Sequence, residues 1–185
     1  MFKDKLLLAN FISNLFYSIA YPTVHFVLIR DIDERIISLN AIIVCIAGII
    51  VPIIWNKKSD ELYNKYGYLL TLEGLSYILL TVAFILGTVD SRLYYLIDTI
   101  LFSIITKNII CGGNKLRALR YTGEEREKFD NDCNILSNAS SLIGFTVSLL
   151  FPLQKYVAFV ILGIGIISDN IFYYRAYKEC NKTEE

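Results

Sequence analysis

Charged side chains are scarce in this chain. Of its 185 residues, 19% are Asp, Glu, Lys or Arg and 55% are hydrophobic. A soluble domain has about a quarter of its residues charged. The charges that are present lie between long apolar runs rather than scattered through them. This distribution excludes an ordinary water-soluble globular fold and indicates an integral membrane protein.

The motifs of metal and redox chemistry are also missing. A single histidine excludes a paired-histidine metal site, and no two of the four cysteines have the close spacing of a zinc or redox motif. The sequence Cys-Gly-Gly-Asn at residues 111–114 lacks the Lys-Ser or Lys-Thr of a phosphate loop. We therefore expect no enzyme activity, no cofactor, no metal and no nucleic-acid partner.

A membrane peptidase that uses cysteine and histidine would have a similar size and number of spans. In this chain, however, His25 is predicted near the outer face, whereas Cys111 and Cys133 are predicted near the inner face. Cys45 lies in the middle of a span without an obvious base. Because a nucleophile must lie within hydrogen-bond reach of its base, this placement argues against that chemistry.

Six apolar stretches are long enough to cross a bilayer, which requires about 20 residues. They are residues 6–29, 36–55, 68–88, 93–111, 133–153 and 156–174. Backbone groups find no water to bond in lipid, so each stretch should be a helix. The sequence thus predicts an all-α, polytopic membrane protein, with one six-helix domain over residues 1–185.

The positive residues are unevenly distributed over the predicted loops. If both termini are cytoplasmic, the inner segments carry thirteen of them: Lys3, Lys5, Lys57, Lys58, Lys65, Lys115, Arg117, Arg120, Arg126, Lys128, Arg175, Lys178 and Lys182. The outer loops carry four: Arg30, Arg35, Arg92 and Lys155. Because cytoplasmic loops are enriched in Lys and Arg, both termini are predicted in the cytoplasm.

The first span carries a stripe of polar residues, which we call the helix 1 stripe. Asn10, Asn14, Ser18, Tyr21 and His25 follow one another at steps of 4, 4, 3 and 4 residues, so they share one helical face. Such a face either packs on other helices through hydrogen bonds or lines a wet cavity. His25 is either a hydrogen-bonding group or a site of proton coupling.

The fourth span contains two charged residues, Asp98 and Lys107, with Tyr95 on its polar half. Asp98 is a candidate proton or cation site within the membrane, unless it reaches interfacial water. In a regular helix, residues nine apart point about 180° apart, so Asp98 and Lys107 should not pair. Lys107 either extends to the interface or pairs with Glu73 on the third span.

The fifth span carries small residues at steps of four, namely Ser140, Gly144 and Ser148. Small residues at this spacing let two helices approach closely. The face they form serves either contact within the same bundle or self-association.

Residues 64–68, Asn-Lys-Tyr-Gly-Tyr, lie between the second and third spans. They resemble the signature loop of the major facilitator superfamily, whose basic-aromatic-glycine core Lys65, Tyr66 and Gly67 match. Asn64 stands where that loop has aspartate, and Tyr68 stands where it has a basic residue. The inner loop before the fifth span is similar too, in Arg117, Arg120 and Arg126 followed by Asn134, Asn138 and Gly144.

The resemblance implies the amino-terminal half of such a transporter. In that family helices 1 and 4 line the cavity, which favours the helix 1 stripe and Asp98 as cavity residues. A full transporter encloses its substrate between two six-span halves. This chain supplies one half, so the resemblance implies a homodimer, a second membrane subunit or a role other than transport.

The leading hypothesis is a half-size transporter of small molecules that works by alternating access as a dimer in a bacterial cytoplasmic membrane. A second hypothesis is a substrate-binding membrane subunit of an ATPase-driven uptake system. A third is an immunity or accessory protein that binds a peptide or a membrane enzyme. The expected partners are therefore the lipid bilayer, a second membrane subunit or copy, and a small-molecule or peptide ligand.

Overall fold

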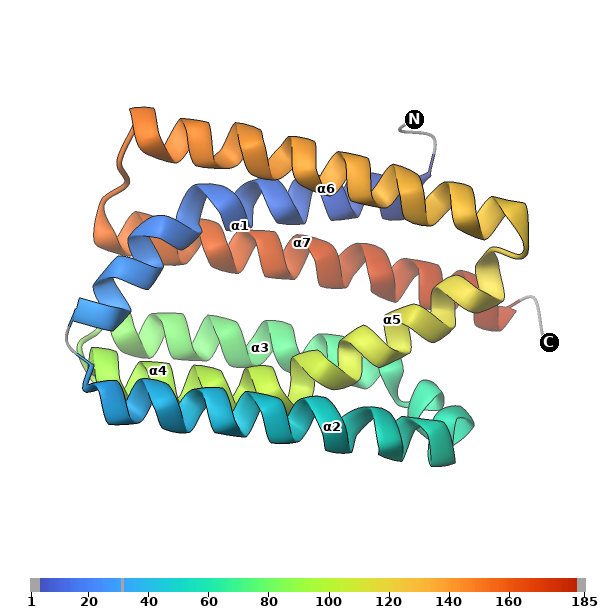
Figure 1. The fold of residues 1–185 in the computed structure, drawn as a ribbon, viewed down its shortest axis with the longest axis horizontal. Coiled ribbons are helices and arrows are strands. Elements are labelled where there is room, and N and C mark those ends of the chain that lie inside the picture. The colour runs from blue at the N-terminus through green and yellow to red at the C-terminus, as the bar shows by residue number, and fades with distance from the viewer. Residues whose placement is uncertain (1–3, 31, 183–185) are drawn as a thin grey trace. The chain divides into compact units, whose positions relative to one another are not determined.

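A computed structural model describes residues 4–30 and 32–182, and this described part is helical with no strand (Figure 1). Lys3, which was counted among the inner positive residues, lies outside it. The helices are α1 (Lys5–Arg30), α2 (Glu34–Asn64), α3 (Tyr66–Ile85), α4 (Ser91–Leu101), the π-helix η1 (Phe102–Thr106), α5 (Lys107–Arg120), α6 (Glu124–Leu150) and α7 (Lys155–Lys182).

The prediction of an all-α protein with six spans is confirmed at the level of length and composition. Because α4, η1 and α5 follow one another directly, they form one long helix over Ser91–Arg120. This helix and α1, α2, α3, α6 and α7 are each long and apolar enough to cross a membrane. Together they indicate a multi-pass membrane protein.

Two predicted spans extend three residues too far at their ends. The third was expected to reach residue 88, but α3 ends at Ile85, and Gly87 follows in a left-handed conformation with φ of +73°. Glycine at this place after a helix is a common stop signal. The fifth was expected to reach residue 153, but α6 ends at Leu150, because Pro152 disfavours the helical conformation for Phe151.

Large apolar side chains cover the outside of α2. Ile42, Ile46, Ile49, Ile50 and Ile53 are each between 48% and 64% exposed. A continuous apolar surface of this kind would be unfavourable in water. It is the surface that a helix presents to lipid.

The chain divides into two compact units. The terminal unit consists of residues 1–26 and 116–185, so it holds most of α1 together with α6 and α7. The central unit consists of residues 27–115, so it holds α2, α3, α4, η1 and most of α5. Helices α1 and α5 each contribute residues to both units.

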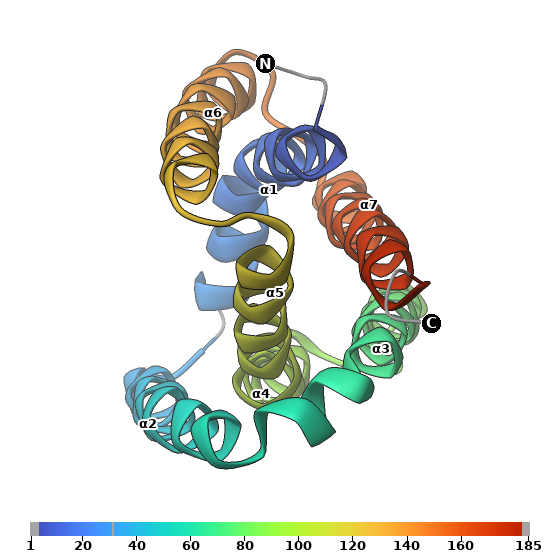
Figure 2. The ribbon, with the colours of Figure 1, turned by 90° about the vertical axis from the view of Figure 1, so that its right-hand side faces the viewer.

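In the terminal unit, α1 lies between α6 and α7 (Figure 2). Both contacts are close because a glycine stands at each. A Cβ atom at Gly144 of α6 would lie 2.6 Å from the Cβ of Ser18, and one at Gly165 of α7 would lie 2.9 Å from the Cβ of Phe16. The backbones of α6 and α7 therefore approach α1 as closely as small residues allow.

The terminal unit is closed at one end by a polar cluster. Glu179, near the end of α7, accepts hydrogen bonds from Lys5 at 3.3 Å and from Arg120 at 3.2 Å. Tyr121 donates to Asp4, and burial together with this bond raises the pKa of the Tyr121 phenol. These contacts bring the start of α1 and the end of α7 to the same end of the unit. Which side of the membrane that end faces stays a prediction.

In the central unit, α4 lies between α2 and α3 (Figure 2), and both α4 and η1 contact these two helices. The ring of Tyr66, which is fully buried, packs where a Cβ atom on Gly112 of α5 would lie. The hydroxyl-bearing side chains Ser103 and Thr99 are buried in the same unit, at 0% and 7% exposed.

Replacing Gly144 with alanine should destabilise the protein. The added methyl group would meet the Cβ of Ser18 and the backbone oxygen of Leu15, at 2.6 and 2.9 Å. Overpacking of this kind costs about 1–3 kcal/mol, so the midpoint of thermal unfolding in mild detergent should fall.

Gly163→Ala on α7 is the matched control, because its Cβ atom would meet nothing within 4 Å. Alanine favours helices over glycine by about 0.5–1 kcal/mol, so this variant should be neutral or stabilised. Equal effects of the two substitutions would contradict the close contact of α6 with α1.

Candidate functional site

Two carboxyl groups, the buried one of Glu73 and the partly exposed one of Asp98, lie where α3 meets α4 and η1. Tyr77 of α3 donates a hydrogen bond of 2.8 Å to Asp98 of α4, and Thr106 of η1 donates one to Glu73 of α3. We call these four residues the polar seam. Glu73 and Tyr77 are four residues apart and therefore share one face of α3. Helix α3 thus supplies one acid and one hydroxyl, and α4 and η1 together supply another acid and another hydroxyl.

Asp98 receives its hydrogen bond from a neutral group. Within the described part of the chain, no Lys, Arg or His nitrogen lies within 4.0 Å of its carboxyl oxygens. An ionised carboxyl group in a low-dielectric interior is costly without a cation beside it. The site therefore suits a carboxyl group that gains and loses a proton.

Two more polar side chains are buried in the central unit with unused hydrogen-bonding capacity. Asn40 of α2 is 3% exposed and Ser103 of η1 is 0% exposed. Among the residues that the structure describes, no partner lies within hydrogen-bond distance of their side-chain polar atoms. A buried polar group without a hydrogen-bond partner is costly, so each such group in a folded protein calls for an explanation.

The π-helical turn η1 changes the direction in which α5 presents its side chains. Its closing bond runs from the Lys107 N–H to the Phe102 carbonyl, one residue farther than in an α-helix. One extra residue rotates everything beyond it by about 100°, so Asp98 and Lys107 differ by about 80° rather than the 180° expected of a regular helix. Thr106 thereby contacts α3, while Asn108 contacts α2.

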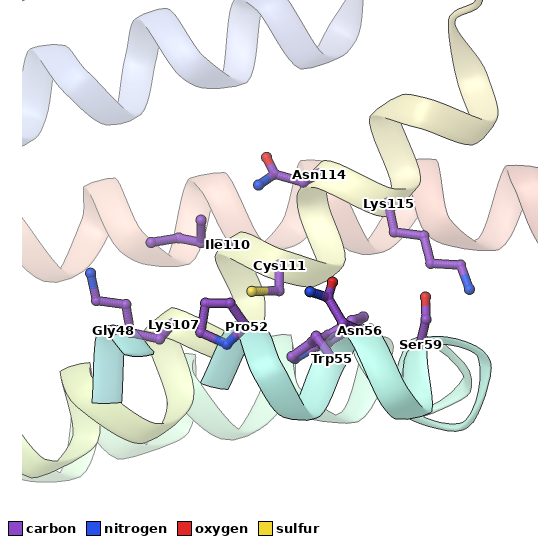
Figure 3. A pocket seen from close by; sticks show the side chains of 10 residues that line it. All are labelled: Gly48, Pro52, Trp55, Asn56, Ser59, Lys107, Ile110, Cys111, Asn114 and Lys115. Carbon is purple, nitrogen blue, oxygen red and sulfur yellow. The ribbon is translucent and has the colours of Figure 1, made fainter. Parts of the chain in front are cut away.

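A cavity of about 670 Å³ lies along α2 and α5 (Figure 3). We call it the α2–α5 cavity. Helix α2 provides half of its lining and α5 the other half, and every lining residue belongs to the central unit. The lining residues are Gly48, Pro52, Trp55, Asn56, Ser59, Lys107, Ile110, Cys111, Asn114 and Lys115.

A lysine stands at each end of the α2–α5 cavity, with Lys107 beside Gly48 and Lys115 beside Ser59 (Figure 3). Lys115 forms an ion pair with Asp60. The Lys107 Nζ atom lies 5.6 Å from the centre of the Phe102 ring, and in residues 4–30 and 32–182 no carboxyl oxygen lies within 4.0 Å of it. Lys107 thus brings an uncompensated positive charge to the cavity.

The chain's single tryptophan, Trp55, forms part of the cavity wall. It is 5% exposed, and its indole N–H donates a hydrogen bond of 2.8 Å to Asn108 Oδ1. This bond joins α2 to the first turn of α5, just beyond the π-helical turn. Because the chain has one tryptophan, emission excited at the red edge of the absorption band, where tyrosine does not absorb, reports on the surroundings of Trp55.

A second, smaller cavity of about 370 Å³ lies in the terminal unit. Asn10 of the helix 1 stripe lines it and donates a hydrogen bond of 3.0 Å to Cys133 Sγ, while Asn14 donates to Asn10. Arg117 and Asp130 also line this cavity, with 4.0 Å between their closest charged atoms. It therefore holds a balanced pair of charges.

The rest of the helix 1 stripe has other surroundings. Ser18 is buried against Gly144, whereas Tyr21 stacks on the exposed His25 with 5.0 Å between ring centres. Ser140 and Ser148 are buried on α6, as Gly144 is, and the Gly144 position contacts α1. The fifth span's small residues are thus buried within a single chain, and a role of this face in self-association stays a prediction.

Asp98 and Tyr95 belong to the central unit, whereas the helix 1 stripe belongs to the terminal unit. A cavity shared by Asp98 and the stripe therefore stays a prediction. The Glu73–Lys107 pair also stays a prediction. In the structure, Glu73 accepts a hydrogen bond from the hydroxyl of Thr106, and Lys107 lines the α2–α5 cavity.

Sequence reasoning missed most of the α2–α5 cavity, including Trp55, Asn56 and Lys115, and it also missed Asn108, the hydrogen-bond partner of Trp55. A signal was present, since the only tryptophan follows Pro52 by three residues and precedes an asparagine.

In the described part of the chain, no three His, Cys, Asp or Glu side chains are grouped to hold a metal ion. Comparison with protein-family models, with curated proteins and with solved structures finds no match.

Replacing Asn108 with leucine should destabilise the central unit and alter the emission of Trp55. The substitution leaves the buried indole N–H without its acceptor, which costs about 1–3 kcal/mol. We expect a lower midpoint of thermal unfolding and a changed tryptophan emission maximum in detergent.

The exposed Asn138 on α6 provides the control, and Asn138→Leu should leave both observables near the wild-type values. If Asn108→Leu left the emission of Trp55 unchanged, the hydrogen bond between α2 and α5 would be contradicted.

Proposed function

We propose that this chain is a half-size, major-facilitator-like membrane protein that transports a small molecule by alternating access. Two copies would form the pathway, in a bacterial cytoplasmic membrane with both termini in the cytoplasm. Proton uptake at Asp98 would drive the cycle. The observation that carries the proposal is the intramembrane Asp98, held by the hydroxyl of Tyr77 and by no cation in the described part of the chain.

The proton-coupling role follows from the electrostatics of the polar seam. An ionised carboxyl group inside a membrane span is expensive, so binding of a proton to Asp98 changes the energy of the central unit substantially. Glu73 lies one turn of α3 away from Tyr77, the donor to Asp98, and is itself 8% exposed. The negative charges of Glu73 and Asp98 repel each other through the low-dielectric interior, which favours a proton on one of the two acids over two negative charges.

The transport role rests on the combination of six spans with polar groups in their interior. Polar and ionisable residues within spans are costly and mark substrate or ion pathways. The resemblance of residues 64–68 to the major facilitator signature loop supports alternating access, in which two bundles move around a central site. His25 is a second candidate for proton coupling.

A substrate-binding membrane subunit is the second candidate function. It is favoured by one observation: residues of a single chain, all within 27–115, line the α2–α5 cavity. Such a site needs no second copy to be complete. A protein of this kind would bind its ligand as a monomer and then associate with an ATPase-driven partner.

Replacing Asp98 with asparagine should abolish proton-driven transport, because the amide keeps the size and hydrogen bond of the side chain but takes up no proton. The protein would be reconstituted in liposomes and screened with a panel of small solutes under an inward proton gradient. Charge movement is recorded on a solid-supported membrane. Wild-type protein should give solute-dependent currents that Asp98→Asn lacks.

Asp90→Asn is the matched control. Asp90 caps the first turn of α4 by accepting a hydrogen bond from the Leu93 N–H. Asparagine caps helices as well as aspartate does, so this variant should keep wild-type currents. Currents that survive in Asp98→Asn would remove the coupling role from Asp98.

The mass of the purified protein separates the two candidate functions. In mild detergent, after subtraction of bound detergent, a self-contained transporter should have the mass of two chains. A monomer that binds a ligand would contradict the dimeric transporter and favour the binding subunit.

A further inference from the structure

We propose that the α2–α5 cavity binds an oxyanion, the carboxylate or phosphate group of a small solute, with Lys107 as its counter-charge. This deepens the proposed function, because it names the chemical class of the transported or captured ligand. The binding step itself needs neither a second copy nor a proton gradient.

The charge of Lys107 is the first ground for an anion. In the part of the chain that the structure describes, its ammonium group has no carboxylate partner, and no Asp or Glu is among the residues that line the cavity. Its contact with the ring of Phe102, at 5.6 Å, is a weak cation–π interaction. An ammonium group has three hydrogen-bond donors, which an oxyanion would satisfy together with the charge.

The polar side chains of the cavity wall are the second ground. Asn56, Ser59 and Asn114 each carry an N–H or O–H donor and line the same space. Lys115 adds a second positive charge about 12 Å along α5, although Asp60 already pairs with it. Donors without a competing acid make the cavity selective for anions over cations.

The size and openness of the cavity are the third ground. Its volume of about 670 Å³ lies within the range of about 300–1,000 Å³ typical of small-molecule sites. Gly48 leaves room beside Lys107, because a Cβ atom there would meet nothing within 4 Å. Asn56 and Asn114 are exposed, so an anion in water reaches the cavity without rearrangement of the fold.

The fluorescence of Trp55 provides a direct test. Wild-type protein in phosphatidylcholine nanodiscs with a tryptophan-free scaffold protein is titrated with sodium phosphate and with sodium succinate, and sodium chloride holds the ionic strength constant. At least one of the two oxyanions should change the emission saturably. A chloride series alone should not.

Variants assign the effect to the cavity. Lys107→Gln should weaken the apparent affinity by roughly tenfold or more, the order expected for the loss of one charge-assisted hydrogen bond. Lys107→Arg keeps the charge and should keep binding. Gly48→Leu meets no neighbouring atom at its Cβ and fills the space beside Lys107, so it should fold and still bind poorly. Lys155→Gln, at the start of α7, should bind as the wild type does.

Three results would overturn the proposal. They are the absence of saturable change with both oxyanions in wild-type protein, equal binding by Lys107→Gln and wild type, and an equal response to chloride. A nanodisc series with phosphatidylglycerol distinguishes the source of the anion. If that lipid blocks the response to phosphate and succinate, the oxyanion site is supported and its natural ligand is a lipid headgroup, which overturns the solute as ligand.

The outcome is separable from that of the transport proposal. Asp98→Asn should still bind the oxyanion, because Asp98 does not line the cavity. Oxyanion binding without solute-dependent proton entry into the liposomes, followed with an internal pH-sensitive dye so that electroneutral symport is also detected, would contradict the transporter and leave the anion site supported. Solute-dependent transport without oxyanion binding would support the transporter and contradict the anion site.

Discussion

A membrane interior supplies no water, so each polar group that enters it must find its partner inside the protein. This constraint governs the helix Ser91–Arg120 more than any other, because it carries an acid, two threonines, a serine, a lysine and an asparagine through its middle. The neighbouring helices α3 and α2 supply hydrogen-bond partners: Tyr77 for Asp98, Glu73 for Thr106, and Trp55 for Asn108. These three hydrogen bonds join the helix Ser91–Arg120 to α2 and α3.

The π-helical turn allows one helix to satisfy two neighbours. In a regular α-helix, residues 102, 105 and 106 would lie on the same face as Asp98, the face toward α3. Lys107 would then lie on the opposite face of the helix. The extra residue in η1 rotates α5 by about one position, so that Thr106 still reaches α3 while Asn108 reaches α2. Hydrogen bonds to neighbouring helices flank this turn, from Tyr77 to Asp98 before it and from Trp55 to Asn108 after it.

Hydropathy alone was sufficient for the six spans, because length and apolar content are local properties of the sequence. The ends of α3 and α6 depended on single residues, Gly87 and Pro152, that a hydropathy window passes over. The helix 1 stripe shows a different limit. Its periodicity predicts one shared face for five residues, but the neighbouring helices decide the environment of each, and Gly144 places Ser18 in a tight contact. The α2–α5 cavity escaped prediction because the π turn interrupts the period on which such reasoning depends.

The carboxyl group of Asp98 and the ammonium group of Lys107 have different surroundings on the helix Ser91–Arg120. The carboxyl group of Asp98 belongs to the side that contacts α3, and the ammonium group of Lys107 belongs to the cavity shared with α2. Had the two formed an ion pair, neither would be available to a proton or to an anion, and both would serve structure alone. Because the π turn lies between them, a change in charge at Asp98 and the arrival of an anion at Lys107 would act on the same five residues, Phe102–Thr106. Under the two proposals, that turn is the physical link through which the binding of one ligand changes the affinity for the other, and such coupling is reciprocal by thermodynamic necessity.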